Sequence, residues 1–88
     1  MINVYIPSPL RMFTDGRSET QVAGETVGEV LENFKTLFPE AAVGFFSPRT
    51  ARYLNLYLND EDVRAIGGMD TPVRDGDELA IVFAVAGG

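Results

Sequence analysis

The residues of this sequence best suited to chemistry are its last two, Gly87 and Gly88. A terminal glycine carboxylate has no Cβ beside it, so an enzyme can draw it through a narrow channel and let ATP, then a sulfur nucleophile, approach it unhindered. The residues before it are slim, since Ala84 and Ala86 are small and Val85 has the one branched side chain. The pattern predicts that Gly88 is a carboxyl group to be activated, and that Ala84, Val85, Ala86 and Gly87 thread into the active site of a partner.

Other reactive groups are scarce. The 88 residues include no Cys and no His, which excludes disulfides, thiol nucleophiles, structural zinc sites and acid–base catalysis by imidazole. The net charge of −6 at pH 7 argues against nucleic-acid binding. It fits a basic protein partner or, alternatively, only a well-solvated surface. The longest apolar run, residues 79–86, is far shorter than the roughly 20 residues that span a bilayer, and the first residues lack a basic signal region. We therefore expect a cytoplasmic protein that does not enter a membrane.

Two acidic clusters could be imagined as cation sites. Residues 60–62 lack the spacing and the number of ligands of a calcium loop. Asp75, Asp77 and Glu78 surround an Asp-Gly turn. We interpret both clusters as solvated turns and predict no metal site.

The hydrophobic pattern predicts four strands and one helix. Alternation of apolar and polar residues predicts strands over residues 2–6, 19–22, 54–58 and 78–83. Thr26 and Glu29 have the spacing of a capping box, and apolar residues recur at helical spacing from Val27 to Phe38. Pro39 is predicted to end this helix.

The connections carry weaker signals. Residues 40–52 have no clear period and are predicted to form a loop that Phe45 and Phe46 anchor on the core, with a turn at Ser47. Residues 59–64 are predicted to turn the chain over, and glycines 67 and 68 extend that irregular stretch.

The order of these elements predicts an α+β domain with a ubiquitin-like β-grasp fold, in which a mixed sheet of about four to five strands packs on one main helix. We expect one domain over residues 1–83 and an appended flexible segment over residues 84–88, called the tail below.

The same alternation predicts which side chains lie on each face of the sheet. The side chains expected to face the helix are those of Leu54, Leu56, Leu58, Leu79, Ile81 and Phe83. Tyr5, Tyr57, Ala80 and Val82 then lie on the opposite face, which is unusually apolar and is predicted to dock partner proteins. The alternative interpretation is that aromatic residues at these positions only favour strands.

The element order, the acidic turn at residues 75–78, the strand after it and the Val-Ala-Gly-Gly ending resemble the ubiquitin-like sulfur carriers. This family includes the small subunit of molybdopterin synthase (MoaD) and the thiazole sulfur carrier (ThiS). The resemblance implies a protein cosubstrate rather than an enzyme, with no bound cofactor. A ubiquitin-activating-type adenylyltransferase would use ATP and magnesium to form an acyl-adenylate on Gly88, and a sulfur donor would convert it to a thiocarboxylate.

Within the family, residues 6–11, residues 59–64 with the glycines that follow, and the tail look most like the CysO-type carrier. That resemblance implies delivery of sulfide to a pyridoxal-phosphate cysteine synthase acting on O-phosphoserine, after which a metal-dependent peptidase trims the added cysteine. Arg64 matches the family motif and is counted among the docking residues, although shielding of the preceding acids explains it equally well.

Three alternatives stay open at this point. A MoaD-like carrier would serve the large subunit of molybdopterin synthase, a ThiS-like carrier would typically be shorter, and a ubiquitin-like protein modifier or interaction module would join Gly88 to target lysines. The sequence departs from the family at residues 83–84, where Phe-Ala stands in a region that often contains proline, which puts the choice of acceptor in doubt. We expect a monomer that visits several enzymes in turn.

Overall fold

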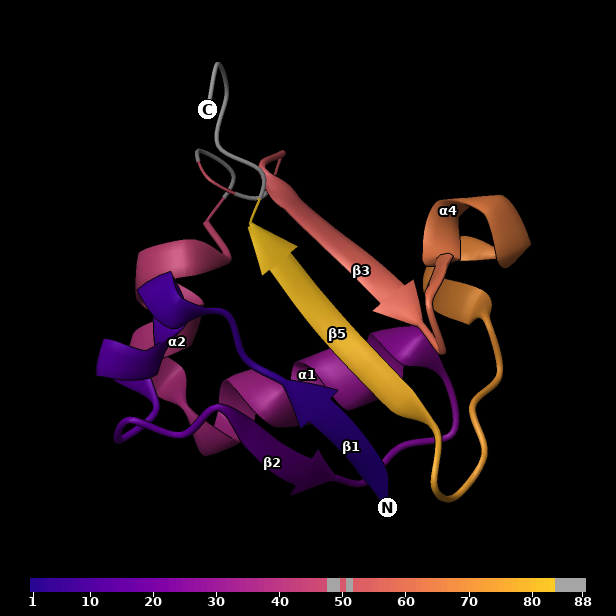
Figure 1. Cartoon of the computed structure of the whole chain (residues 1–88), viewed down its shortest axis with the longest axis horizontal. Coiled ribbons are helices and arrows are strands. Elements are labelled where there is room, and N and C mark those ends of the chain that lie inside the picture. Colours follow the sequence, from indigo (N-terminus) through magenta and orange to yellow (C-terminus); the bar gives the residue numbers. More distant parts are fainter. Residues whose placement is uncertain (48–49, 51, 84–88) are drawn as a thin grey trace.

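A mixed five-stranded sheet forms the body of the protein, as the computed structural model shows for residues 1–47, 50 and 52–83 (Figure 1). The strands are β1 (Ile2–Tyr5), β2 (Glu19–Val22), β3 (Leu54–Leu58), β4 (Glu61–Asp62) and β5 (Glu78–Phe83). They lie in the order β2-β1-β5-β3-β4. The central strands β1 and β5 run parallel, and every other neighbouring pair is antiparallel.

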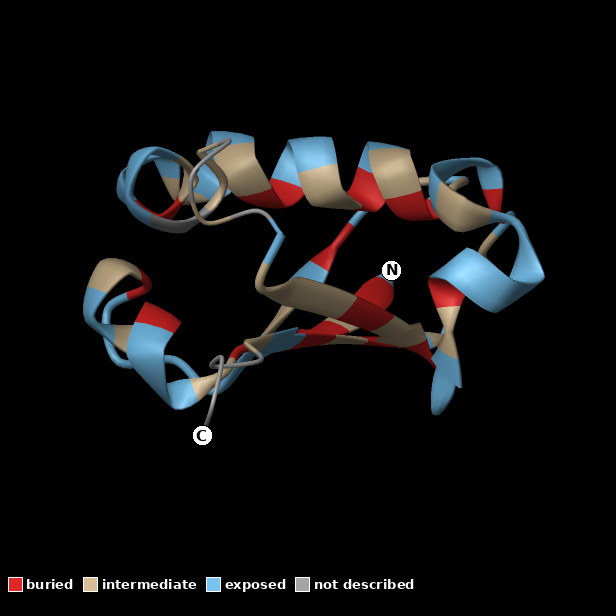
Figure 2. Ribbon diagram, turned by 90° about the horizontal axis from the view of Figure 1, so that it is seen from above, coloured by how far each residue is buried: buried red, intermediate tan, exposed pale blue. Residues whose placement is uncertain are grey.

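One long helix, α1 (Val27–Leu37), crosses one face of this sheet (Figure 2). The shorter helical segments are η1 (Ser8–Phe13), α2 (Pro39–Phe45), α4 (Val63–Ile66) and η2 (Gly68–Asp70). The arrangement confirms the predicted α+β β-grasp architecture, with a mixed sheet packed on one main helix. The division into residues 1–83 and a tail stays a prediction, because residues 84–88 lie outside the described part of the chain.

The hydrophobic core lies between α1 and the sheet. Phe34 of α1 is fully buried, and its ring contacts those of Phe38 and Phe46 at centroid distances of 5.3 and 6.0 Å. The buried strand residues are Ile2, Val4, Val22, Leu56, Leu58, Leu79 and Ile81. Leu54 is half-buried and packs against this core. The face assignment made from the alternation therefore holds for β1, β3 and β5.

The start of α1 follows the predicted cap with one difference. The hydroxyl of Thr26 accepts a hydrogen bond from the amide of Glu29 at 3.1 Å, as a capping box requires. The Glu29 carboxylate, however, accepts from the amide of Glu25 at 3.3 Å rather than from that of Thr26. The cap residue still satisfies one free amide at the helix end and fixes where α1 begins.

The prediction of a loop over residues 40–52 is wrong at its beginning. Residues 39–45 form α2, with Pro39 at its first turn, where a missing amide hydrogen costs no helical hydrogen bond. Phe46 packs on the core as predicted, whereas the side chain of Phe45 lies outside what the structure describes. The segment after β1 contains the 3-10 helix η1.

The prediction of a simple turn over residues 59–64 is also incomplete. Asn59 and Asp60 form the turn, with φ angles of 49° and 71°, the left-handed pair that a two-residue hairpin needs. The chain then pairs back on β3 as β4 and continues into α4. In the part of the chain that the structure describes, no helix is long and apolar enough to cross a membrane.

Candidate functional site

The candidate site combines the sheet face opposite α1 with the end of β5, from which the tail continues. Figure 2 shows α1 on one side of the sheet, while the other side is left uncovered by any described helix. We call this other side the outer face. It consists of the strand residues that alternate with the buried ones. These residues are accessible because α1 covers only the opposite side of the sheet.

Strand register brings three of the predicted docking residues into one row. Tyr5 of β1 lies opposite Ala80 of β5, and Ala80 lies opposite Tyr57 of β3. Residues paired across neighbouring strands project to the same face, so the three side chains are neighbours. Glu19 of β2 and Asp62 of β4 occupy the two ends of the same row. The row therefore has an apolar centre between two carboxylates.

Val82 lies two residues beyond Ala80 on β5, on the same face of the sheet, and is paired with Asn55 of β3. Its side chain is 40% exposed, and that of Tyr5 is 36% exposed, whereas Tyr57 and Ala80 are half-buried. The sequence thus correctly placed all four residues on one face. Whether that face docks a partner stays a prediction.

Tyr5 is tied to the acidic border of the outer face. Its hydroxyl donates a hydrogen bond to the carboxylate of Glu78 at 3.1 Å. This hydrogen bond, then partial burial and the negative charge of Glu78, raises the pKa of Tyr5 above its ordinary value of 10.0. A phenol with a pKa above 10.0 is neutral at physiological pH, and its hydroxyl is directed toward Glu78, two residues before Ala80 on β5.

Arg64, the remaining predicted docking residue, stands on α4 at the edge of the sheet. Its guanidinium donates to both carboxylate oxygens of Asp62, at 3.2 and 2.8 Å, and its amide donates to the same carboxylate at 2.9 Å. These bonds hold the pKa of Asp62 below its ordinary value. Because Asp62 lies opposite Tyr57, the Arg64–Asp62 pair borders the row. Both interpretations of Arg64, as a docking residue and as a partner of a preceding acid, fit this position.

The base of the tail is held by aromatic contacts that the sequence did not predict. β5 ends at Phe83, which lies opposite Leu54 of β3. The Phe83 ring is 6.0 Å from that of Tyr53, and the guanidinium of Arg52 lies 5.2 Å from the Tyr53 ring centroid. Phe83 has the same position in the strand alternation as Ile81, as predicted. It is only half-buried, however, and its ring contacts that of Tyr53.

Arg52 falls in the stretch without periodicity, and Tyr53 lies between that stretch and the predicted strand over residues 54–58. An aromatic residue directly before a strand was the available signal. The predicted threading and modification residues lie outside the described residues, namely Ala84, Val85, Ala86, Gly87 and Gly88.

The start of β5 is fixed by a polar cluster. The carboxylate of Asp77 accepts from the amide of Arg74 at 2.8 Å and from the side-chain amide of Asn59 at 3.1 Å, which lowers the pKa of Asp77. Asn59 also accepts from the amide of Glu78 at 3.0 Å. Among residues 1–47, 50 and 52–83, no group of three or more acidic side chains is placed to hold a metal ion.

Comparison with known proteins places this geometry in context. The model of the ThiS family matches residues 4–88. The sulfur carrier protein CysO of Mycobacterium tuberculosis is 36% identical over 91 residues, covering 99% of this chain and 98% of the relative.

Two solved structures have the same fold. The crystal structure of the Amycolatopsis orientalis BexX/CysO complex matches with a TM-score of 0.86 and 37% identity over the whole of both chains. The solution structure of small archaeal modifier protein 1 from Methanosarcina acetivorans matches with a TM-score of 0.82 and 26% identity, covering 99% of this chain and 95% of the other.

Proposed function

The chain belongs to the ThiS family, and we propose on that basis that it is a sulfur carrier whose Gly88 carboxyl group is adenylated and then converted to a thiocarboxylate. It acts as a cosubstrate of partner enzymes. The observation that supports this most is the full-length similarity to a sulfur carrier protein, which spans the body and the glycine-ended tail alike.

The chemistry needs no side chain of this protein. The Gly88 carboxylate attacks the α-phosphorus of ATP on an adenylyltransferase, which forms the acyl-adenylate and releases pyrophosphate. A sulfide-level donor then attacks the acyl carbon, so a C–S bond forms and AMP leaves. Magnesium serves the activating enzyme by binding the nucleotide phosphates. A chain without Cys can carry sulfur in this way because the backbone carboxyl group is the carrier.

The described body gives the tail a fixed starting point at Phe83, the last residue of β5. Phe83 is paired with β3 and in contact with Tyr53, so the five residues that follow start from a defined point. In an extended conformation inside a channel, those five residues span about 17 Å. That length lets a partner enclose Gly88 while its surface rests on the body. We assign that resting surface to the outer face, with Tyr5, Tyr57, Ala80, Val82 and, at its border, Arg64.

We propose cysteine biosynthesis as the pathway, with a pyridoxal-phosphate cysteine synthase as the acceptor and a metal-dependent peptidase acting afterwards. The 36% identity to CysO supports this choice over a MoaD-like role beside the large subunit of molybdopterin synthase. A second candidate is a protein modifier that joins Gly88 to lysines of other proteins, which the likeness to a small archaeal modifier protein favours.

The test is a reconstitution followed by intact mass measurement. The full-length protein is incubated with a purified adenylyltransferase of the ubiquitin-activating class, ATP, magnesium and sulfide. We expect replacement of one oxygen by sulfur at Gly88, and no change in a matched variant that lacks Gly87 and Gly88. An unaltered mass together with adducts on lysines of added proteins would instead support the modifier.

Two further arms separate the acceptor and the docking surface. The thiocarboxylated protein is offered to a cysteine synthase with O-phosphoserine and, separately, to a molybdopterin synthase large subunit; sulfur loss to the first alone is expected. Val82→Asp should weaken binding to the adenylyltransferase, whereas Ile66→Asp, a control at an exposed position on α4, should not. Equal behaviour of these two variants would remove the outer face from the proposal.

A further inference from the structure

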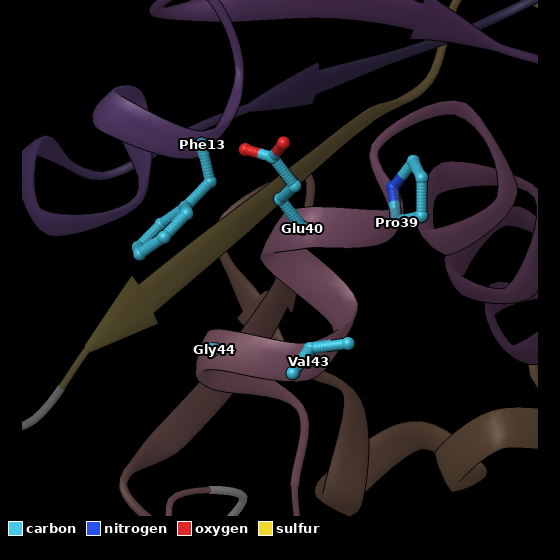
Figure 3. A pocket seen from close by; sticks show the side chains of 5 residues that line it. All are labelled: Phe13, Pro39, Glu40, Val43 and Gly44. Atoms are coloured by element: carbon cyan, nitrogen blue, oxygen red, sulfur yellow. The ribbon is translucent and has the colours of Figure 1, made fainter.

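An apolar groove separate from the outer face lies between η1 and α2. A cleft of about 470 Å³ is lined by Phe13, Pro39, Glu40, Val43 and Gly44 (Figure 3). A neighbouring cleft of about 180 Å³ shares Phe13, Pro39 and Glu40 and adds Asp15, Leu37 and Phe38. Because the two clefts share these three lining residues, we treat them together and call them the η1–α2 groove.

The groove exposes apolar side chains that contribute little to the core. Val43 on α2 is 80% exposed and Leu37 on α1 is 56% exposed, and neither belongs to the buried core. Isolated exposed apolar residues are common, but two that border one concave apolar surface mark a site of interaction.

Gly44 keeps the wall of the groove in place. A Cβ at this position would lie 3.3 Å from Cζ of Phe13, closer than an ordinary contact, so the absent side chain lets the Phe13 ring lie against α2. Glycine inside a helix costs about 1 kcal/mol relative to alanine. Glycine is nevertheless suited to this position, because a larger residue would push the Phe13 ring aside.

Two carboxylates border the apolar surface. Figure 3 shows Glu40 projecting from α2 toward the side of η1 that carries Phe13. Asp15, just after η1, lines the smaller cleft with Glu40. None of the ion pairs found among the described residues involves Asp15 or Glu40. The nearby Arg11 donates from Nε to the carbonyl of Ile6, so its side chain is tied to the backbone there.

Topology places the groove near the base of the tail. η1 begins shortly after β1 ends, and β1 runs parallel to β5. The groove therefore lies at the end of the sheet where β5 ends, as Figure 1 shows for η1 and α2. An enzyme that encloses the tail has the groove within reach of its surface.

We propose that the η1–α2 groove is a second docking surface, for a partner protein that inserts an apolar side chain flanked by arginine or lysine. The apolar walls bury the inserted side chain, and Asp15 and Glu40 pair with the flanking bases. The proposal rests on the proposed function only in taking this partner to be one that also receives the tail. The groove chemistry itself can be tested without any reaction at Gly88.

The test is an NMR titration of the full-length ¹⁵N-labelled protein with two synthetic peptides, acetyl-Arg-Leu-Leu-Arg-amide and acetyl-Glu-Leu-Leu-Glu-amide. The basic peptide should shift the amide signals of Phe13, Val43 and Gly44 in a saturable way, and the acidic peptide should not. Glu40→Gln combined with Asp15→Asn should weaken binding about fivefold, since each exposed ion pair contributes modestly. Asparagine suits position 15 because φ there is 55°.

Two controls guard against nonspecific attraction to an acidic protein. Glu61→Gln removes an exposed charge on β4 and should leave the affinity unchanged, while Val43→Ser should reduce it. A second depression, between α1 and η2, is lined by Glu29, Glu32 and Asp70 together with Lys35, which pairs with Glu32, and serves as an internal control.

The proposal is overturned by equal shifts in the α1–η2 depression and the groove, by equal binding of both peptides, or by no saturable shift. It is also overturned if the groove signals move with protein concentration alone, which would identify a second copy of the chain as the occupant. Thiocarboxylation at Gly88 is unaffected by any of these outcomes, so this proposal and the proposed function fail separately.

Discussion

Asn59 connects the end of β3 to the start of β5, and its replacement by alanine should destabilise the fold in two separable ways. Its side chain donates to Asp77 at 3.1 Å and accepts from the amide of Glu78 at 3.0 Å. Its backbone has a φ of 49°, in the left-handed region that asparagine and glycine tolerate best. Alanine loses both hydrogen bonds and strains the turn.

The magnitude follows from these contacts. Two solvent-exposed hydrogen bonds contribute at the low end of their usual range, about 0.5 kcal/mol each. The left-handed backbone costs alanine about 1 kcal/mol more than asparagine. Asn59→Ala should therefore lower the free energy of unfolding by about 2 kcal/mol, which for a domain of this size lowers the melting temperature by roughly 8–16 °C.

Asn59→Gly is the matched variant, because it removes the same hydrogen bonds and keeps the favoured φ angle. It should cost about 1 kcal/mol, half the effect of alanine. Urea unfolding followed by far-ultraviolet circular dichroism measures both, since the chain has no Trp for fluorescence. Equal losses for the two variants would refute the strain argument, and a loss below about 0.3 kcal/mol for glycine would refute the hydrogen-bond argument.

Three further predictions concern the core and the charged groups. Phe34→Ala should cost about 3–5 kcal/mol, since the ring is fully buried, while Leu37→Ala on the exposed side of the same helix should be nearly neutral in urea unfolding. Asp77 has a lowered pKa, so the stability that its ionised carboxylate contributes is present above its ordinary pKa of 3.8 and is lost as pH falls through the lower folded-state pKa. Asp77→Asn should therefore flatten the acid side of a plot of unfolding free energy against pH. Tyr5 has a raised pKa, so the contribution of its bond to Glu78 is present below 10.0 and lost as pH rises through the folded-state pKa. Glu78→Gln should shift Tyr5 ionisation to lower pH in tyrosinate absorbance, and Glu19→Gln should shift it less.

The faces of the sheet could be predicted from sequence because a half-buried strand has only one way to point its side chains. Leu56 and Leu58 alternate with Tyr57, and a slip of one residue would expose both leucines. Burial in the structure follows this parity, with Leu56 and Leu58 in the core and Tyr57 on the outer face.

The second helix could not be predicted in the same way. Pro39 ends the periodic pattern of α1, yet proline is equally suited to the first turn of a helix, and here it begins α2. A seven-residue helix has about two turns, too few to show a hydrophobic period. The η1–α2 groove could not be predicted from the sequence either, because it depends on a contact between Phe13 and Gly44, which are far apart in the chain.

The residue types of the tail carry the proposed chemistry, and the described structure gives a geometric reason to link the proposed docking surface with threading of the tail. Ala80 and Val82 stand on the outer face of β5, and the strand ends one residue later at Phe83. Strand residues advance by about 3.3 Å, so a partner seated on these side chains meets the first tail residue at a fixed distance and direction. The apolar row costs the body exposed hydrophobic surface. The charged groups at its ends, Glu19 and the Arg64–Asp62 pair, limit that cost, and Glu19 favours a basic group on the partner. A helix on the outer face would have hidden the row, so under the proposed function the placement of α1 on the opposite face (Figure 2) keeps the proposed docking surface accessible beside the end of β5.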